Sequence, residues 1–294
     1  MADAAGSASV GTIPVQHLRA GDHAFVSYAD DDAGRDVVSA FAWAGLVKRE
    51  KVMVFADPHM DDEQVWARLD APGAVLGSAR AHGQLVLSSM RALIHPQDAF
   101  TPRRQWERIT QETDLALAEG YTGLRTYIDM HWVGELGADV EVMMQRESHA
   151  GHLFTDRPYT EICAYDSRWF APDVLMAMHE AHPCRLLPRP GALHVEQAEG
   201  MVQLAGEADL ATREQFLGAV RDGLRRHADS GQPLTVDLTG LVFLGVACAV
   251  DLLRLVLDHP HGPVRVNCPP TPARILRGVG ADQVPHMVIS EVGR

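Results

Sequence analysis

Eight side chains near the ends of predicted strands in the first 186 residues carry groups that suit ligand binding. All are polar or aromatic, and in open α/β sheets ligands sit where strands end. The candidates are His23, Tyr28, Arg125, Trp132, Glu147, Tyr165, Asp166 and His182. We predict that these side chains line a pocket for a small molecule.

Arg125 has a second interpretation. Arg125, Tyr127 and Asp129 alternate along their predicted strand and therefore share one of its faces. A buried arginine normally needs an anionic partner, and Glu147 or Asp166 would serve. An internal ion pair is the favoured interpretation of Arg125, and the ligand pocket is the alternative.

Two histidine pairs resemble metal-binding spacing only superficially. In each pair the imidazoles are three positions apart, and two cysteines occur nearby in the sequence. The residues concerned are His149 and His152, His179 and His182, Cys163 and Cys184. The second pair lacks the i, i+4 spacing of a zincin helix, and the chain has no CxxC pair. We predict core or surface histidines and no metal site.

The loop after the first predicted strand, Ala29–Gly34, is acidic. A phosphate-binding loop needs glycines and a lysine, but this loop has three consecutive aspartates, and neither Lys48 nor Lys51 follows a glycine loop. Three carboxylates repel a triphosphate, so we predict no nucleotide hydrolysis and no cofactor. A divalent cation would reverse this argument, but a solvated helix N-terminus is the favoured interpretation.

The first part of the chain alternates apolar runs with amphipathic runs. Predicted strands cover residues 23–28, 51–56, 84–89, 123–130 and 159–165, and predicted helices cover residues 34–44, 63–69, 101–120, 138–149 and 172–181. This alternation indicates a doubly wound, mostly parallel sheet with helices on both faces. We assign residues 17–186 to this domain, with a flexible tail over residues 1–16 and a proline-rich linker over residues 187–192.

A second, smaller α/β domain is predicted over residues 193–290. Its elements follow the order β–β–α–β–α–β–α–β, and the first two strands are separated by the turn Glu199-Gly200. The order again indicates an α/β domain, and the two-domain division agrees with a chain of 294 residues.

One stretch of this second domain combines a buried strand with a long apolar helix. The predicted strand is Leu234–Leu238, and the helix begins near Val246. On that helix Asp251, Arg254 and Asp258 form a polar stripe at spacings of three and four, typical of a helix with one wet edge.

Composition narrows the class of protein. The chain is 46% hydrophobic and 22% charged, as globular proteins are, and its formal charge of −13 argues against nucleic-acid binding. Scattered cysteines, the lack of a signal-peptide pattern and apolar runs too short to cross a bilayer predict a cytoplasmic protein.

Several segments of the first domain resemble the MEDS domain, named for methanogen, methylotroph and dichloromethane-regulator sensory proteins. The segments are LRAGDHAFVSY, GLVKREKVMVFADP, ALAEGYTGLRTYIDMHW, EICAYD and HEAHP. The resemblance covers nearly all of residues 17–186. It implies a sensory role in signal transduction, for small organic molecules, on a core similar to RecA-type ATPases without the catalytic loop.

The second domain resembles STAS domains, the fold of anti-sigma-factor antagonists. Their switch segment reads Asp-Leu-Ser, a few apolar residues, then Phe-x-Asp-Ser-Ser-Gly-Leu; this chain has Asp237-Leu238-Thr239 and then FLGVACA from Phe243. The serine that the family's kinase phosphorylates is replaced by Val246. Thr239, the nearest hydroxyl, is interpreted as a strand-end threonine bonded to the backbone. The resemblance assigns partner binding to Thr239, Gly245, Val246, Asp251, Arg254 and Asp258.

These observations predict a non-enzymatic signalling protein. We expect the sensory domain to control contacts of the STAS domain with an anti-sigma factor, a related regulatory kinase or another STAS protein, and so to regulate transcription. A small organic ligand is the expected signal, and neither nucleic acid nor a membrane is an expected partner. The alternatives are a nucleotide- or small-molecule-binding switch or enzyme on the RecA-like core, and a scaffold for homo-oligomers.

Overall fold

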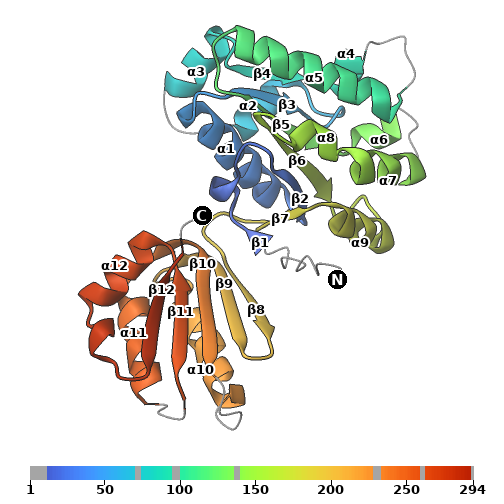
Figure 1. Ribbon diagram of the computed structural model, residues 1–294. Helices are drawn as coiled ribbons and strands as arrows, with labels where there is room; N and C mark the ends of the chain where they lie inside the picture. Colours follow the sequence, from blue (N-terminus) through green and yellow to red (C-terminus); the bar gives the residue numbers. More distant parts are fainter. Residues whose placement is uncertain are drawn as a thin grey trace, which may run out of the picture. The chain divides into compact units, whose positions relative to one another are not determined.

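The computed structural model describes residues 12–69, 74–94, 100–135, 140–227, 233–258 and 262–292 (Figure 1). The chain divides into two compact units, essentially residues 15–189 and residues 190–294. Of the tail predicted over residues 1–16, residues 1–11 lie outside the described part. The remainder includes a two-residue strand and the start of a short 3-10 helix, Val15–His17, in which Val15 is buried.

Seven strands form the larger sheet, in the order β1-β7-β2-β6-β5-β3-β4. They are β1 (Thr12–Ile13), β2 (His23–Tyr28), β3 (Lys51–Phe55), β4 (Leu85–Ser88), β5 (Leu124–Asp129), β6 (Tyr159–Asp166) and β7 (Cys184–Leu186). The neighbours from β7 to β4 pair in parallel. Every residue of β3, β5 and β6 is buried, as strands covered on both faces are.

Helices cover both faces of this sheet. They are α1 (Asp31–Val47), α2 (Asp62–Arg68), α3 (Ala74–Ala81), α4 (Met90–Ile94), α5 (Pro102–Ala118), α6 (Trp132–Glu135), α7 (Val140–His149), α8 (Gly151–Phe154) and α9 (Pro172–Ala181). Helix α1 packs on the face that bears Arg125, where Gly45 meets that side chain. Helix α9 packs on the opposite face, where its His179 ring meets Phe25. The doubly wound α/β class predicted from the sequence is confirmed.

Local sequence signals explain where several helices begin. Asp30 caps α1, because its carboxylate accepts the backbone N–H of Ala33 at 2.8 Å. Thr101 caps α5 in the same way, with Pro102 in the first turn, as the sequence predicts. The sequence did not predict the short strands β1 and β7 or the helices α3, α4, α6 and α8, each of which has eight residues or fewer.

The second unit has a five-stranded sheet in the order β12-β11-β10-β9-β8. Its elements are β8 (Leu193–Ala198), β9 (Met201–Ala208), α10 (Arg213–His227), β10 (Leu234–Leu244), α11 (Val246–Leu257), β11 (Val264–Cys268), α12 (Pro270–Gly278), a 3-10 helix (Ala281–Gln283) and β12 (Met287–Glu291). Strands β8 and β9 form the predicted antiparallel hairpin around Glu199-Gly200, and the other pairs are parallel. Apolar side chains of the strands and of α10, α11 and α12 form one core.

The strand predicted over Leu234–Leu238 continues to Leu244, so the expected early turn was wrong. The pairing of β10 with β9 shifts register on both sides of Gly240. A side chain at Gly240 would lie 2.6 Å from Ala205 Cβ, so this glycine permits a close approach of the two strands. The helix start predicted near Val246 is confirmed.

A substitution at Gly223 on α10 would test how closely this helix packs on the sheet. A Cβ there would lie 2.3 Å from Val202 Cγ2 on β9, so we expect Gly223→Ala to lower the free energy of unfolding of the second unit by about 1–3 kcal/mol. Gly218→Ala is the matched control on the same helix, because its Cβ would meet no atom within 4 Å. It should leave stability unchanged or raise it by up to about 1 kcal/mol. Urea unfolding measures both, and equal effects would contradict the packing.

Candidate functional site

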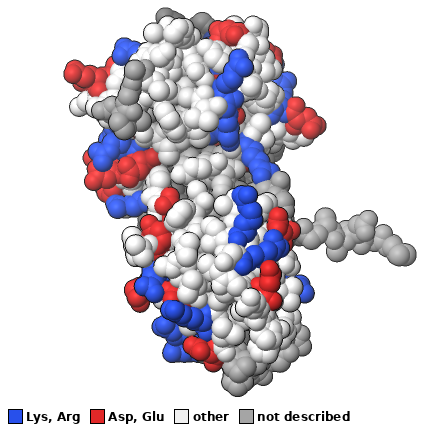
Figure 2. All heavy atoms as spheres, turned by 90° about the vertical axis from the view of Figure 1, so that its left-hand side faces the viewer, with Lys and Arg blue, Asp and Glu red and all other residues white. Residues whose placement is uncertain are grey.

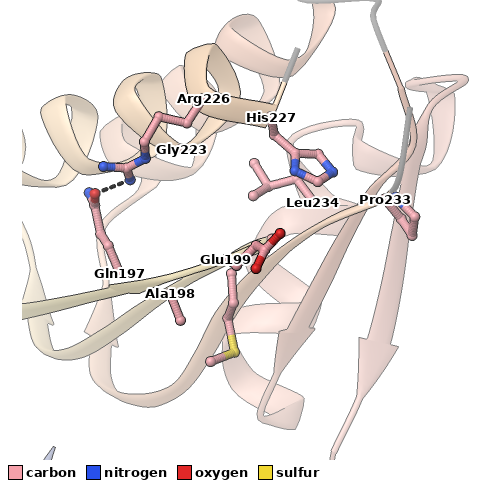
Figure 3. Close-up of a pocket in the computed structure, with 10 residues that line it drawn as sticks. Gln197, Ala198, Glu199, Gly223, Arg226, His227, Pro233 and Leu234 are labelled. Atoms are coloured by element: carbon pink, nitrogen blue, oxygen red, sulfur yellow. Dashed lines mark hydrogen bonds between the residues drawn. The ribbon is translucent and has the colours of Figure 1, made fainter. Parts of the chain in front are cut away.

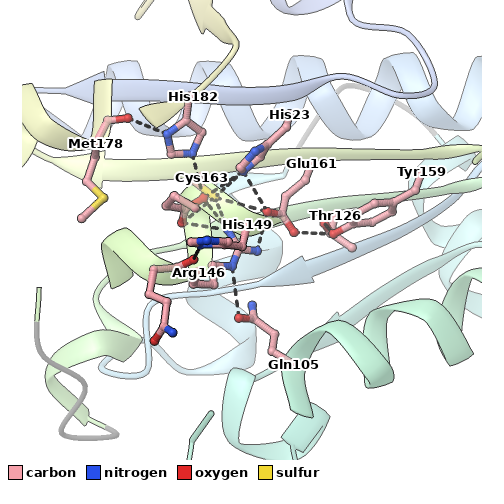
Figure 4. Close-up of polar contacts among 12 residues, drawn as sticks. His23, Gln105, Thr126, Arg146, His149, Tyr159, Glu161, Cys163, Met178 and His182 are labelled. Atoms are coloured by element: carbon pink, nitrogen blue, oxygen red, sulfur yellow. Dashed lines mark hydrogen bonds and ion pairs between the residues drawn. The ribbon is translucent and has the colours of Figure 1, made fainter. Parts of the chain in front are cut away.

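A buried polar cluster lies between the larger sheet and helices α7 and α9 (Figure 4). We call it the Arg146 cluster; its members are His23, Arg146, Glu147, Glu161, Cys163 and His182, each between 0% and 3% exposed. The parallel register pairs His23 with Glu161 and Phe25 with Cys163, so these strand residues share a face. Helix α7 supplies Arg146 and Glu147, and His182 follows α9.

Arg146 holds two buried carboxylates. Its Nη1 donates to both oxygens of Glu147 at 2.7 Å, and its Nη2 donates to Glu161 Oε1 at 2.5 Å. The same guanidinium donates to Gln105 Oε1 at 3.2 Å and to Cys163 Sγ at 3.3 Å. Burial alone would raise the pKa of Glu161, but Arg146 and His23 lower it to about 2. The pKa of Glu147 is lowered in the same way. Both carboxylates are therefore ionised inside the protein.

His23 bridges the same two carboxylates. Its Nε2 lies 3.0 Å from Glu147 Oε2 and 3.2 Å from Glu161 Oε1, and its ring stacks on Phe154 with 4.6 Å between centroids. Burial acts to lower the pKa of His23, but its bonds to the two carboxylates raise it. The second oxygen of Glu161 accepts the hydroxyl of Tyr159. A protonated His23 and Arg146 together balance the two negative charges.

His182 enters the cluster with a fixed orientation. Its Nδ1 lies 2.6 Å from the carbonyl oxygen of Met178, which can only accept, so Nδ1 carries the proton. In the neutral ring Nε2 then carries a lone pair and no proton. This nitrogen lies 3.3 Å from Glu147 Oε2 and makes no hydrogen bond. Burial lowers the pKa of His182 to about 4, although Glu147 opposes this, so the ring is neutral.

Cys163 completes a group of four donor side chains. Its Sγ lies 3.7 Å from His23 Nε2 and 3.8 Å from Glu147 Oε1. Burial raises the pKa of this thiol well above its ordinary value, and both carboxylates add to the effect. One donor atom each from His23, Glu147, Cys163 and His182 lies within 4.8 Å of the other three. Imidazole nitrogen, thiolate sulfur and carboxylate oxygen are the donors that bind transition metals.

The structure brings three of the eight predicted ligand-binding residues into this cluster: His23, Glu147 and His182. Tyr165 packs beside it, with its ring 5.1 Å from Phe25 and 6.3 Å from His182. Sequence reasoning missed Arg146 and Glu161 as members. The signal for Glu161 was its place in the alternating run that also contains Cys163 and Tyr165; nothing in the sequence of α7 pointed to Arg146.

The remaining predicted residues lie elsewhere. Tyr28 is on the opposite face of the sheet, where its hydroxyl donates to Asp129 at 3.1 Å. Asp166 pairs there with Arg168 at 2.6 Å. Trp132 on α6 packs against Phe100. Tyr28 and Asp166 do not converge with the Arg146 cluster, because alternate residues of one strand point to opposite faces. Trp132 belongs to the apolar core that also includes Tyr165.

Arg125 forms an internal ion pair, but the predicted partners were wrong. Its Nε donates to Glu50 Oε2 at 2.6 Å, and neither Glu147 nor Asp166 takes part. Its guanidinium also lies over the ring of Phe41, at 4.7 Å from the centroid. Glu50 stands between α1 and β3, so the pair fastens that connection to β5.

The acidic loop after β2 is engaged in internal contacts. Asp30 caps α1 and pairs with Arg189 at 2.5 Å, and Asp31 pairs with Arg168 at 2.6 Å. Farther along the same edge, a hollow of about 470 Å³ opens at the ends of β3 and β4, beside Asp57 and Asp62. Arg91 also lines this hollow, so carboxylates and a guanidinium share this edge of the sheet.

The second unit has its own hollow, about 570 Å³, between the β8–β9 turn and the end of α10 (Figure 3). Glu199, Arg226 and His227 line it, and Arg226 donates a hydrogen bond to Gln197. Residues 228–232, which follow α10, lie outside the described part. The polar side chains Gln197, Glu199 and Arg226 are exposed to solvent here, whereas those of the Arg146 cluster are buried and paired, so the cluster is the stronger candidate site.

The six predicted partner-binding residues differ in accessibility. Asp251 is 7% exposed and pairs with Arg213 of α10 at 2.6 Å. The expected polar stripe of α11 is therefore exposed to solvent only in part. Arg254 and Asp258 are exposed. Thr239 lies inside β10, half-buried, and its backbone N–H donates to Asp237, so its assignment to a strand end was wrong.

Apolar side chains are exposed in the β9–α10 connection, at the end of β10 and at the start of α11. Gly245 precedes α11, and its backbone N–H donates to the carbonyl of Ala208 at the end of β9, which places the two connections side by side. We define the β10–α11 surface by its exposed apolar residues, Leu210, Val242, Phe243 and Val246. The end of β10 and the start of α11 therefore present large apolar side chains to solvent.

Two further observations concern the apolar length of the helices and the charges on one face of the molecule. None of the described helices is both long and apolar enough to cross a bilayer. On the face that Figure 2 shows, lysine and arginine side chains lie among aspartate and glutamate side chains instead of forming one continuous patch.

The first unit is thus a doubly wound α/β domain with a charge-paired polar centre under its helices. Residues 22–183, more than half of the chain, match the family described as MEDS, the methanogen/methylotroph, DcmR sensory domain, and the chain belongs to this family. No curated protein matches. Among solved structures, flagellar accessory protein FlaH from Methanocaldococcus jannaschii is similar, with 10% identity over 63% of this chain and 76% of that chain, at a TM-score of 0.40.

Removing the guanidinium of Arg146 should destabilise the first unit. Arg146→Met leaves two buried carboxylates facing each other, and we expect it to lower the free energy of unfolding by about 3–5 kcal/mol. Arg103→Met is the control, because Arg103 pairs with Glu107 on the surface of α5 with its side chain 85% exposed; it should change little. Chemical denaturation compares the two, and an equally small loss for both would contradict the electrostatic role of Arg146.

Proposed function

We propose that this chain is a non-enzymatic signal-transduction protein whose MEDS domain senses a small organic molecule and controls a protein–protein contact of the second unit. The single observation that carries the proposal is the match of residues 22–183 to a sensory-domain family. A sensory domain passes its signal to an output domain. The second unit lies outside residues 22–183 and is the candidate output domain in this chain.

The second unit supports an output role through its order of elements. The order β8-β9-α10-β10-α11-β11-α12-β12 agrees with the resemblance to STAS domains over residues 193–290. We propose that the unit is a STAS-like domain in an anti-sigma-factor-antagonist-like regulator of transcription. Its partners would then be an anti-sigma factor, a related regulatory kinase or another STAS protein, in the cytoplasm.

The β10–α11 surface is the proposed docking site. Phe243 and Val246 are half or more exposed and flank the N-terminus of α11. Arg254 and Asp258 add exposed charges on the same helix. An apolar centre with charged groups at its margin is the usual composition of a protein–protein interface.

Control of this contact is proposed to come from the MEDS domain and not from phosphorylation of the docking site. Val246 occupies the position of the family's phosphorylated serine and has no hydroxyl. Thr239 is half-buried within β10 and so is poorly placed for a kinase. The internal pairing of Asp30 and Asp31 supports a non-enzymatic role for the loop after β2.

A charge on the docking site should weaken partner binding. Tagged full-length chain is purified from the cells that produce it, partners are identified by mass spectrometry, and the affinity of a purified partner is then measured. Val246→Glu should weaken binding at least about tenfold, because it places a carboxylate in an apolar contact. Val288→Glu on β12 is the control, because Val288 is 55% exposed and Val246 is 61% exposed. Equal affinities for the two variants, or recovery of no regulatory partner, would contradict the proposal.

A further inference from the structure

We propose that the Arg146 cluster holds a four-coordinate zinc ion, bound by His23 Nε2, a Glu147 carboxylate oxygen, Cys163 Sγ and His182 Nε2 (Figure 4). The proposal goes beyond the sensory function and does not depend on it. It also differs from what the sequence predicts, since neither histidine pair noted there supplies both imidazoles.

Donor-to-donor distances carry the first argument. Zinc bonds of about 2.0–2.3 Å in a tetrahedral site place neighbouring donors roughly 3.3–3.8 Å apart. Nε2 of His23 and of His182 lie 3.0 Å and 3.3 Å from Glu147 Oε2. Sγ of Cys163 lies 3.7 Å from His23 Nε2 and 3.8 Å from Glu147 Oε1. One donor atom of each side chain lies within 4.8 Å of the other three, so small side-chain adjustments bring the four donors to the spacing of a tetrahedral ion.

The orientation of His182 carries the second argument. Because Nδ1–H is donated to the carbonyl of Met178, the lone pair of Nε2 points into the cluster at a carboxylate oxygen of Glu147. Two acceptors 3.3 Å apart repel each other unless a cation lies between them. A second ring nitrogen bonded to a backbone carbonyl is also the usual way in which a zinc-bound histidine is held.

Formal charge is compatible with the ion. Without zinc, protonated His23 and Arg146 balance the carboxylates of Glu147 and Glu161. Zinc would displace one proton from His23 and one from the Cys163 thiol, so the buried site stays neutral when the ion binds. Arg146 Nη1 lies 3.3 Å from Cys163 Sγ and donates to Glu147, so the guanidinium orients two ligands from outside the coordination sphere.

The donor set and its burial identify the kind of site. Two nitrogens, one sulfur and one oxygen suit zinc, whereas magnesium and calcium prefer oxygen alone. Four protein ligands without solvent access define a closed, structural site instead of a catalytic one. Such an ion would fasten β2 and β6 to α7 and to the end of α9, elements far apart in the sequence.

The histidines of the first sequence pair provide matched controls. His149 and His152 are exposed, and their Nδ1 atoms lie near backbone carbonyls of α7. Replacing both by glutamine leaves the cluster untouched. Cys184→Ser is the corresponding cysteine control, since Cys184 is only partly buried on β7.

Metal content of the full chain tests the proposal. Protein purified without chelators, then supplied with zinc and gel-filtered, is analysed by inductively coupled plasma mass spectrometry. We expect about one zinc ion per chain for the native protein and for both controls, and a loss of at least about tenfold for His182→Gln and for Cys163→Ser. Native protein that retains no zinc, or variants that retain as much as the controls, would overturn the proposal.

A second measurement needs no variant and so remains decisive if the variants fail to fold. Chelator-stripped native chain is titrated with Co(II), which should produce thiolate-to-metal charge-transfer absorption and the intense visible bands of a tetrahedral site. Zinc should displace the cobalt, abolish these bands and raise the midpoint of thermal unfolding. Absence of the charge-transfer band on a folded chain excludes Cys163 as a ligand and overturns the site.

Discussion

Two ionised carboxylates are buried under the helices of the first unit, and Arg146, together with His23, compensates their charge. Glu147 and Glu161 are both fully enclosed, and Arg146 donates to each at 2.7 Å and 2.5 Å. The cost of burying such charges is high unless each has a partner and further hydrogen bonds. The ion pair of Arg146 with Glu161 connects α7 to β6, and His23 of β2 contacts both carboxylates.

The alternation of apolar and amphipathic runs was enough to predict the doubly wound α/β class and its main strands. It could not predict the candidate site as a group. Residues near strand ends were expected to converge, but strand periodicity sends Tyr28 and Asp166 to one face and His23 and Tyr165 to the other. The contacts of Arg146 depend on how α7 lies on the sheet, which local sequence does not encode. The partner of Arg125 was mistaken for the same reason, because Glu50 belongs to a connection between elements.

Prediction from the sequence was limited in a similar way for the second unit. The start of α11 was predictable from its apolar run, but β10 continues past Thr239 because Gly240 allows a close approach to β9. Burial of Asp251 was also missed, since its partner Arg213 lies on another helix. What remains accessible is the β10–α11 surface, which supports the proposed role in partner docking. We propose that the first unit senses the signal while its buried polar centre keeps the helices on the sheet.

X-ray absorption at the zinc edge of the full-length, zinc-loaded chain tests the proposed metal centre most directly, because it reports the ligands themselves. We expect one sulfur at about 2.3 Å and three nitrogen or oxygen neighbours at about 2.0–2.2 Å. A zinc spectrum without a sulfur neighbour, or with six oxygen neighbours, would contradict a metal centre built from His23, Glu147, Cys163 and His182.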